Sequence, residues 1–117
     1  MKTISDAQSF IDTRKLLNWL IINFSAVHRS YKQLLGESCM KEATLMLSYI
    51  SNAIITRDED VRLDYLNKYM ASLTVINAFI DILVEAKQLS YKKEAEFAIL
   101  EENLGKQINN WRNKLLK

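Results

Sequence analysis

The sequence predicts an all-α protein, an antiparallel up-down-up-down four-helix bundle. The chain of 117 residues contains no proline and two glycines, which leaves almost none of the residues that β-turns require. Apolar residues recur three and four positions apart along nearly the whole chain, as in helices with one buried face. Short polar stretches are all that interrupt this repeat, and short links join antiparallel neighbours. A chain of this length is expected to form one domain, 1–117.

Four stretches carry the helical repeat, at about residues 6–26, 31–55, 59–87 and 91–116. In the first, the inward stripe consists of Phe10, Leu17, Leu20 and Phe24. In the second, the residues expected to face inward are Leu35, Cys39, Met46, Ile50 and Ala53. Both patterns predict helices that bury one face against the rest of the bundle.

The third stretch has the most regular repeat, formed by Leu66, Tyr69, Leu73, Ile76, Ile80 and Leu83. This two-in-seven pattern is typical of helices that pack at about 20°. Acidic residues at 58–60 precede it, where they favour the positive end of a helix. Ser90 stands where the N-cap of the last helix belongs. That helix is expected to turn inward Phe97, Leu104, Ile108, Trp111 and Leu115.

Two of these helices carry more apolar surface than one inward stripe requires. Residues 16–24 are apolar on nearly all sides, and a second apolar stripe runs beside the first on the third helix. A helix that is apolar all round is usually buried on two sides. These residues therefore predict a subunit interface, with scattered surface residues or a widely covered internal helix as the alternative. The predicted interface comprises Leu16, Trp19, Ile22, Val75, Phe79 and Ile82.

Basic residues concentrate in the first and last parts of the chain, although the formal net charge is only +2. In an antiparallel bundle the start of the first helix and the end of the last lie at the same end. Such a basic end can attract phosphate groups, and several subunits in a ring would multiply the effect. The alternative is that these residues only complement a helix C-terminus or a solvated tail. The residues concerned are Lys2, Arg14, Lys15, Arg112, Lys114 and Lys117.

The titratable residues do not form a recognisable catalytic or metal site. His28 is the only histidine, and it falls in the link between the first two helices, where a solvated side chain is expected. Cys39 falls on the inward face of the second helix and is expected to pack as a small apolar residue. We therefore expect no enzyme, no metal and no cofactor.

The sequence also bears on the cellular compartment. The longest dense apolar stretch, residues 16–24, is far shorter than the roughly 18 residues that a membrane span needs. No charged-then-apolar leader is apparent, and the lone Cys39 suits a reducing compartment. We expect a cytoplasmic protein that does not enter a membrane.

Several short segments, taken in order, resemble those of a known family. They are residues 16–22 (LLNWLII), the turn with Arg29 and Lys32, Leu35-Gly36, Leu89-Ser90, and Leu104-Gly105 followed by Trp111. In this order and spacing they resemble the accessory variability determinant (Avd-like) family, small four-helix bundles encoded beside the reverse transcriptases of diversity-generating retroelements. The resemblance covers about residues 14–114. The bundles encoded by ribosomal-RNA intervening sequences are a related family that looks similar in the last two helices.

The resemblance implies a non-catalytic homopentamer that binds the reverse transcriptase and its template RNA or DNA. Arg29 and Lys32, in the basic turn of the family, would then contact phosphates or the partner. The first and third helices would supply the subunit interfaces. A different reading of the same bundle is a structural protein that holds a protein partner and does not bind nucleic acid.

The sequence departs from the family pattern at several positions. Val27-His28-Arg29 stands where members usually have Phe-Pro-Arg, and loss of the proline should loosen this turn. Asn77 and Asp81 stand where arginines are common, and Asn109-Asn110 replaces a glycine pair. These departures leave the expected fold and oligomer unchanged and bear on nucleic-acid binding.

Overall fold

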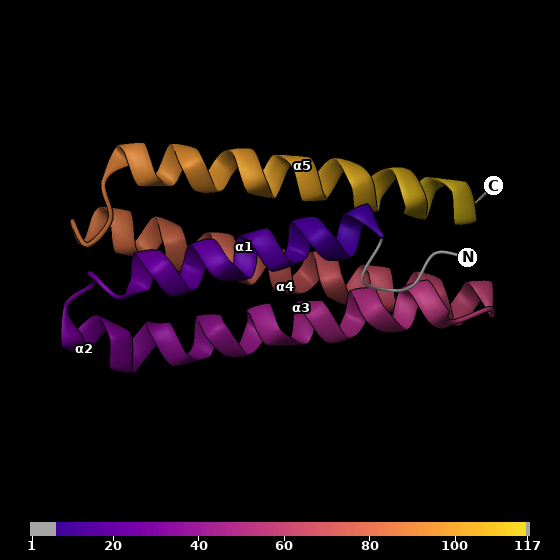
Figure 1. Ribbon diagram of the computed structural model, residues 1–117, viewed down its shortest axis with the longest axis horizontal. Coiled ribbons are helices and arrows are strands. Elements are labelled where there is room, and N and C mark those ends of the chain that lie inside the picture. The colour runs from indigo at the N-terminus through magenta and orange to yellow at the C-terminus, as the bar shows by residue number, and fades with distance from the viewer. Residues whose placement is uncertain (1–6, 117) are drawn as a thin grey trace.

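The computed structural model describes residues 7–116, and within this part of the chain the regular structure is entirely helical, with no strand. Four long helices run along the longest of the three dimensions, 43 × 22 × 21 Å (Figure 1). They are α1 (Gln8–Phe24), α3 (Glu37–Ile55), α4 (Glu59–Glu85) and α5 (Tyr91–Leu115). Two short segments lead into α3 without a break, α2 (Arg29–Tyr31) and the π-helical turn η2 (Lys32–Gly36). The prediction of an all-helical protein is confirmed for residues 7–116.

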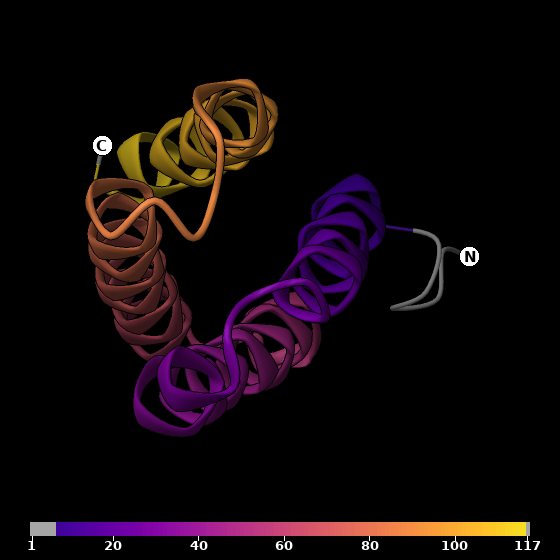
Figure 2. The ribbon, with the colours of Figure 1, turned by 90° about the vertical axis from the view of Figure 1, so that its left-hand side faces the viewer.

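The four long helices pack as a bundle with one helix at each corner. α1 contacts α3 and α5, and α4 contacts the same two helices. The view along the bundle in Figure 2 accordingly places α1 and α4 at opposite corners. This arrangement gives α1 and α4 outer surfaces that face away from each other.

Most of the predicted core lies in the interior. All six residues of the α4 repeat are buried, and so are Phe97, Leu104 and Ile108 of α5. The α3 positions Cys39, Met46, Ile50 and Ala53 are also buried. Residues nearer the helix ends are only partly covered and pack against this core, as Phe10, Leu35, Trp111 and Leu115 do.

The buried stripe of α1 differs from the predicted one. Leu16, Leu20 and Phe24 are buried at steps of four, whereas Leu17 is only half-buried. Leu16 is 1% exposed, so its assignment to a subunit interface is wrong. The physical reason is that the buried stripe continues back to Asp12. Its carboxylate accepts hydrogen bonds from the side chains of Asn103 and Gln107 on α5, and these bonds fix the rotation of α1 about its own axis.

Local signals at the ends of α4 and α5 explain where these helices begin and stop. The Asp58 carboxylate accepts hydrogen bonds from the backbone of Asp60 (2.9 Å) and Val61 (3.1 Å). Ser90 Oγ accepts from the Lys93 backbone at 3.1 Å, which confirms the predicted N-cap. At its end α4 closes in a Schellman arrangement with Lys87 in the left-handed conformation, φ 60°.

Arg62 joins three helices at the end of the bundle where α3 passes into α4. Its Nε donates to the Ala53 carbonyl at 2.9 Å and its Nη2 to the Thr56 carbonyl at 2.5 Å. The guanidinium also lies over the Trp111 ring, 5.6 Å from its centroid. Arg62 therefore satisfies free carbonyls at the C-terminus of α3 while it covers the indole of α5.

Candidate functional site

The basic residues predicted to contact nucleic acid fall into two separate groups. Arg14 and Lys15 lie in the first half of α1, and Arg112 and Lys114 lie in the last turns of α5, at the same end of the molecule (Figure 1). Lys114 borders a surface hollow together with Gln8 of α1. Lys117 and Lys2 lie outside the described residues.

Arg29 and Lys32 lie at the other end of the molecule, in α2 and η2. α1 rises by about 1.5 Å per residue, so its length from Arg14 onward separates the two groups by ~15–20 Å. The predicted residues therefore do not make one continuous basic surface on a single chain. They make two smaller ones, at opposite ends of α1.

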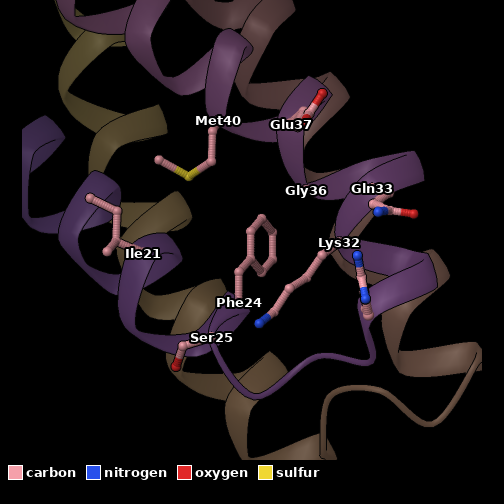
Figure 3. Close-up of a pocket in the computed structure, with 9 residues that line it drawn as sticks. Ile21, Phe24, Ser25, Lys32, Gln33, Gly36, Glu37 and Met40 are labelled. Atoms are coloured by element: carbon pink, nitrogen blue, oxygen red, sulfur yellow. The ribbon is translucent and has the colours of Figure 1, made fainter.

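Arg29 and Lys32 border a groove of about 500 Å³ between the last turns of α1 and the start of α3. We call it the basic-rimmed groove. Its apolar part consists of Ile21, Phe24 and Met40, and Figure 3 draws their side chains around one shared space, with Lys32 beside the Phe24 ring. Its polar rim consists of Ser25, Arg29, Lys32, Gln33 and Glu37, and Gly36 completes the wall.

The π-helical turn shapes one wall of this groove. The backbone N–H of Glu37 donates to the Lys32 carbonyl, five residues back, so η2 is wider than an α-helical turn. Lys32, Gln33 and Gly36 all come from this widened turn. π-helical turns inside α-helices occur frequently at functional sites.

The turn before η2 is held in place by hydrogen bonds rather than by a proline. His28 is the N-cap of α2, and its Nδ1 pairs with Ser30 Oγ at 2.9 Å. The His28 backbone N–H donates to Gln88 Oε1 at 2.8 Å, which ties this turn to the link between α4 and α5. The groove is therefore anchored even though the proline of the Avd-like pattern is missing.

The basic-rimmed groove combines water-exposed apolar surface with unpaired positive charge. Ile21 is 54% exposed although it lies next to the buried Phe24. Arg29 and Lys32 are exposed, and neither forms an ion pair with another of residues 7–116. Glu37 is the acid on the rim. Such a groove can bind an apolar group with an adjacent anion.

The remaining predicted interface residues differ in exposure. Ile22 is 68% exposed on α1, and Val75 and Ile82 are exposed on α4. Trp19 and Phe79 are half-buried and pack against the core. Trp19 also donates from Nε1 to Glu96 Oε1 at 3.1 Å and lies 5.6 Å from the Phe97 ring, so it belongs to the contact between α1 and α5.

A buried polar cluster between α1 and α5 did not figure in the sequence prediction. Asp12, 5% exposed, accepts hydrogen bonds from the side chains of Gln8, Asn103 and Gln107. Beside it, the hydroxyls of Thr13 and Tyr69 share a buried hydrogen bond of 2.7 Å. The sequence does contain one indication of this cluster. Asp12 stands four residues before Leu16 and eight before Leu20, on the face of the helix that these two leucines bury.

The groove between α4 and α5 is lined by both polar and apolar residues. It is about 440 Å³, with Met70 and Leu73 in its apolar part and, among its polar residues, Asn77, Glu101, Glu102, Lys106, Asn109 and Asn110. Burial raises the pKa of Glu101, and the nearby Asp81 carboxylate raises it further. Asn77 thus lies among amide and acidic side chains, and Asp81 lies near Glu101.

Two further observations concern the single cysteine and the residues that could bind a metal. Burial raises the pKa of the Cys39 thiol to about 12, with a smaller effect from Glu42, so this thiol stays protonated. Residues 7–116 contain no group of three or more His, Cys, Asp or Glu placed to hold a metal ion. In the same part of the chain, no helix has both the length and the apolar character to cross a bilayer.

Comparison of the sequence with family models and with curated proteins finds no match.

Proposed function

We propose that this chain is a non-catalytic accessory protein of a diversity-generating retroelement. It would act in the cytoplasm as a homo-oligomer, a pentamer by its resemblance to Avd-like proteins, and bind the reverse transcriptase and its template RNA or DNA. The observation that carries the proposal is the exposed apolar surface on two opposite helices of the bundle, at Ile22 on α1 and at Val75 and Ile82 on α4.

These two apolar surfaces suit a ring. A ring of five subunits needs two different surfaces on each subunit that fit each other. α1 and α4 occupy opposite corners of the bundle (Figure 2). Ile22 of one copy packed against Val75 and Ile82 of the next would bury apolar side chains that a single copy leaves in water.

The proposal includes an antiparallel up-down-up-down order of the helices, which two contacts between α1 and α5 support. Asp12, early in α1, is hydrogen-bonded by Gln107, late in α5. Trp19, later in α1, is hydrogen-bonded to Glu96, early in α5. Residue numbers thus run in opposite senses along these helices.

In this proposal the nucleic acid contacts the basic group at the start of α1 and the end of α5. A single chain offers only a few cations in this group, with a net charge of +2. A ring repeats the group around its axis, which strengthens the attraction for a phosphate backbone without any change in the subunit.

The oligomer can be tested by changing the α4 surface. Val75→Ser combined with Ile82→Ser should lower the mass measured by light scattering to that of one chain, 13.6 kDa, because the interface loses its apolar contacts. Ile99→Ser is the matched control, since Ile99 is 70% exposed on α5 and lies outside the proposed interface. A wild-type mass of 13.6 kDa at high concentration would refute the oligomer.

Nucleic-acid binding can be tested by titrating single-stranded RNA at several salt concentrations. The logarithm of the affinity should fall with the logarithm of the salt concentration, by a slope of about 0.7 for each phosphate contact. Arg14→Glu combined with Lys114→Glu should weaken binding and flatten this slope while the fold is kept, since both side chains are exposed. No binding at low salt, or a slope of zero, would remove the electrostatic mechanism.

The groove between α4 and α5 favours a second candidate function. Asn77 and Asp81 stand where the resemblance leads us to expect arginines, and Lys106 in the lining is paired with Glu102 at 3.4 Å. The lining therefore offers a phosphate no unpaired cation and suits a basic protein surface better. The second candidate is a structural protein that holds a protein partner without nucleic acid. Binding of the reverse transcriptase that survives nuclease treatment, together with no affinity for RNA, would favour it.

A further inference from the structure

We infer that the basic-rimmed groove is a docking site for a segment of a partner protein. The segment would place one aliphatic or aromatic side chain against Ile21, Phe24 and Met40. A neighbouring Asp or Glu of the segment would pair with Arg29 and Lys32. The inference rests on the proposed function for the identity of the partner, the reverse transcriptase, and adds the chemistry by which that partner is recognised.

The apolar part of the groove has room for a side chain that the chain itself does not supply. A space of about 500 Å³ falls in the range of ligand-binding clefts. Ile21 stays 54% exposed beside it, so apolar surface faces water where a partner could cover it. Met40 has an unbranched, flexible side chain, which can adapt to different apolar occupants.

The charges on the rim determine which kind of residue stands beside that apolar side chain. Arg29 and Lys32 lie on one side of the groove and have no acidic partner among residues 7–116. Figure 3 shows the Lys32 side chain running beside Phe24, so an anion bound there would adjoin the apolar occupant. Charge complementarity therefore selects an acidic residue next to the apolar one.

The same features disfavour a nucleic acid as the occupant. A nucleobase carries polar edges that Ile21, Phe24 and Met40 cannot hydrogen-bond, and burying them unpaired is costly. Glu37 on the rim would repel a second phosphate of the backbone. An aliphatic or aromatic side chain of a peptide buries no unpaired polar edge in the groove. A single carboxylate beside it is enough to pair with Arg29 and Lys32, so no second anion has to approach Glu37.

A set of labelled twelve-residue peptides tests this directly by fluorescence anisotropy. Each peptide carries one Leu, Ile, Met or Phe in a Gly/Ser background with Asp or Glu at neighbouring positions, and a matched set carries Lys instead. We expect acidic peptides to bind more tightly than their Lys counterparts. Arg29→Glu combined with Lys32→Glu should weaken acidic peptides about tenfold and strengthen the Lys peptides.

Two control variants separate the groove from general charge and general apolar surface. Lys41→Glu combined with Lys92→Glu makes the same charge change on exposed residues outside the groove, and peptide affinity should stay the same. Ile21→Ser should weaken binding, whereas Leu34→Ser should not, since Leu34 is 74% exposed in η2, beside the groove, but does not line it.

Four results would overturn the inference. The first is equal affinity for acidic and Lys peptides, and the second is peptide binding that Ile21→Ser leaves unchanged. The third is RNA that displaces the labelled peptide from the wild-type protein but not from Ile21→Ser. The fourth is a lower oligomer mass for Ile21→Ser, which would assign the groove to a second copy of the chain. If the reverse transcriptase binds the Ile21→Ser and Arg29→Glu/Lys32→Glu variants as tightly as the wild type, the docking site fails and the proposed function stands. If the peptides bind as expected but the reverse transcriptase does not, the proposed function fails alone.

Discussion

Replacing Phe97 by alanine is expected to lower the free energy of unfolding by about 3–5 kcal/mol, a large part of the stability of a small domain. Phe97 is 1% exposed and is among the largest fully buried side chains. Its ring lies 5.6 Å from that of Trp19, so the change removes an aromatic contact between α1 and α5 and also leaves a cavity. Urea titration followed by far-UV circular dichroism would measure the effect.

Ile99→Ala is the matched control for this prediction. It removes an apolar side chain from the same helix at a position that is 70% exposed, so the expected change is under about 0.5 kcal/mol. Both variants should be compared at one protein concentration, because an oligomer adds stability that depends on concentration. A Phe97→Ala protein as stable as Ile99→Ala would contradict the packing of α5 described above.

The buried face of α4 could be predicted from sequence because one of its apolar stripes repeats at steps of three and four without interruption from Leu66 to Leu83. Leu66, Ile76 and Leu83 belong to a pattern in which every alternative rotation would expose several apolar residues. α1 could not be predicted in the same way. Both Leu16 and Leu17 fit a three-and-four spacing with Leu20, and the choice is made by hydrogen bonds from α5 to Asp12. Periodicity contains no information on such tertiary contacts.

The basic-rimmed groove could be predicted only in part. The positive charges of Arg29 and Lys32 are visible in the sequence, and the Avd-like resemblance points to them. The groove itself depends on the π-helical turn, which differs from an α-helical turn by a single hydrogen-bond shift from Lys32 to Glu37. It also depends on the end of α1, which supplies Ile21 and Phe24 from the other wall. The π-helical turn has no sequence signature, whereas the inward position of Phe24 near the end of the first helix was predicted.

The carboxylate of Asp12 connects α1 to α5 more specifically than any apolar contact between them. Oδ1 accepts from Gln8 at 2.9 Å, and Oδ2 accepts from Asn103 at 3.0 Å and from Gln107 at 2.6 Å. The Lys15 ammonium lies 3.7 Å from Oδ1. A buried charge is tolerated when its hydrogen-bonding capacity is satisfied in this way. Any other register of α1 against α5 would move the amides of Asn103 and Gln107 away from the carboxylate and leave its charge unpaired, which is costly.

Asp12→Ala is therefore expected to lower the free energy of unfolding by about 2–4 kcal/mol, since hydrogen bonds to a charged group contribute more than neutral ones. Asp12→Asn is expected to cost somewhat less. Its amide has nearly the same shape but only one oxygen to accept with, so its NH2 group must face either the donors on the Oδ1 side, Gln8 and Lys15, or those on the Oδ2 side, Asn103 and Gln107. Urea titration of the two variants beside the wild type would measure both effects.

Acid should remove the advantage of Asp12 over asparagine. Burial alone raises the pKa of Asp12, but hydrogen bonds from Gln107, Asn103 and Gln8 and the charge of Lys15 more than offset it, and the net pKa lies below the ordinary value of 3.8. A carboxyl group with a lowered pKa in the folded state stabilises the protein above its unfolded pKa, and this contribution is lost as the pH falls through the folded pKa. The stability difference between wild type and Asp12→Asn should thus be constant above about pH 5 and shrink below pH 3.8. All other carboxylates, Glu101 included, occur in both proteins, so to a first approximation their titration cancels from the difference. A difference that stays constant down to pH 2 would mean that the Asp12 carboxylate does not hold α1 against α5.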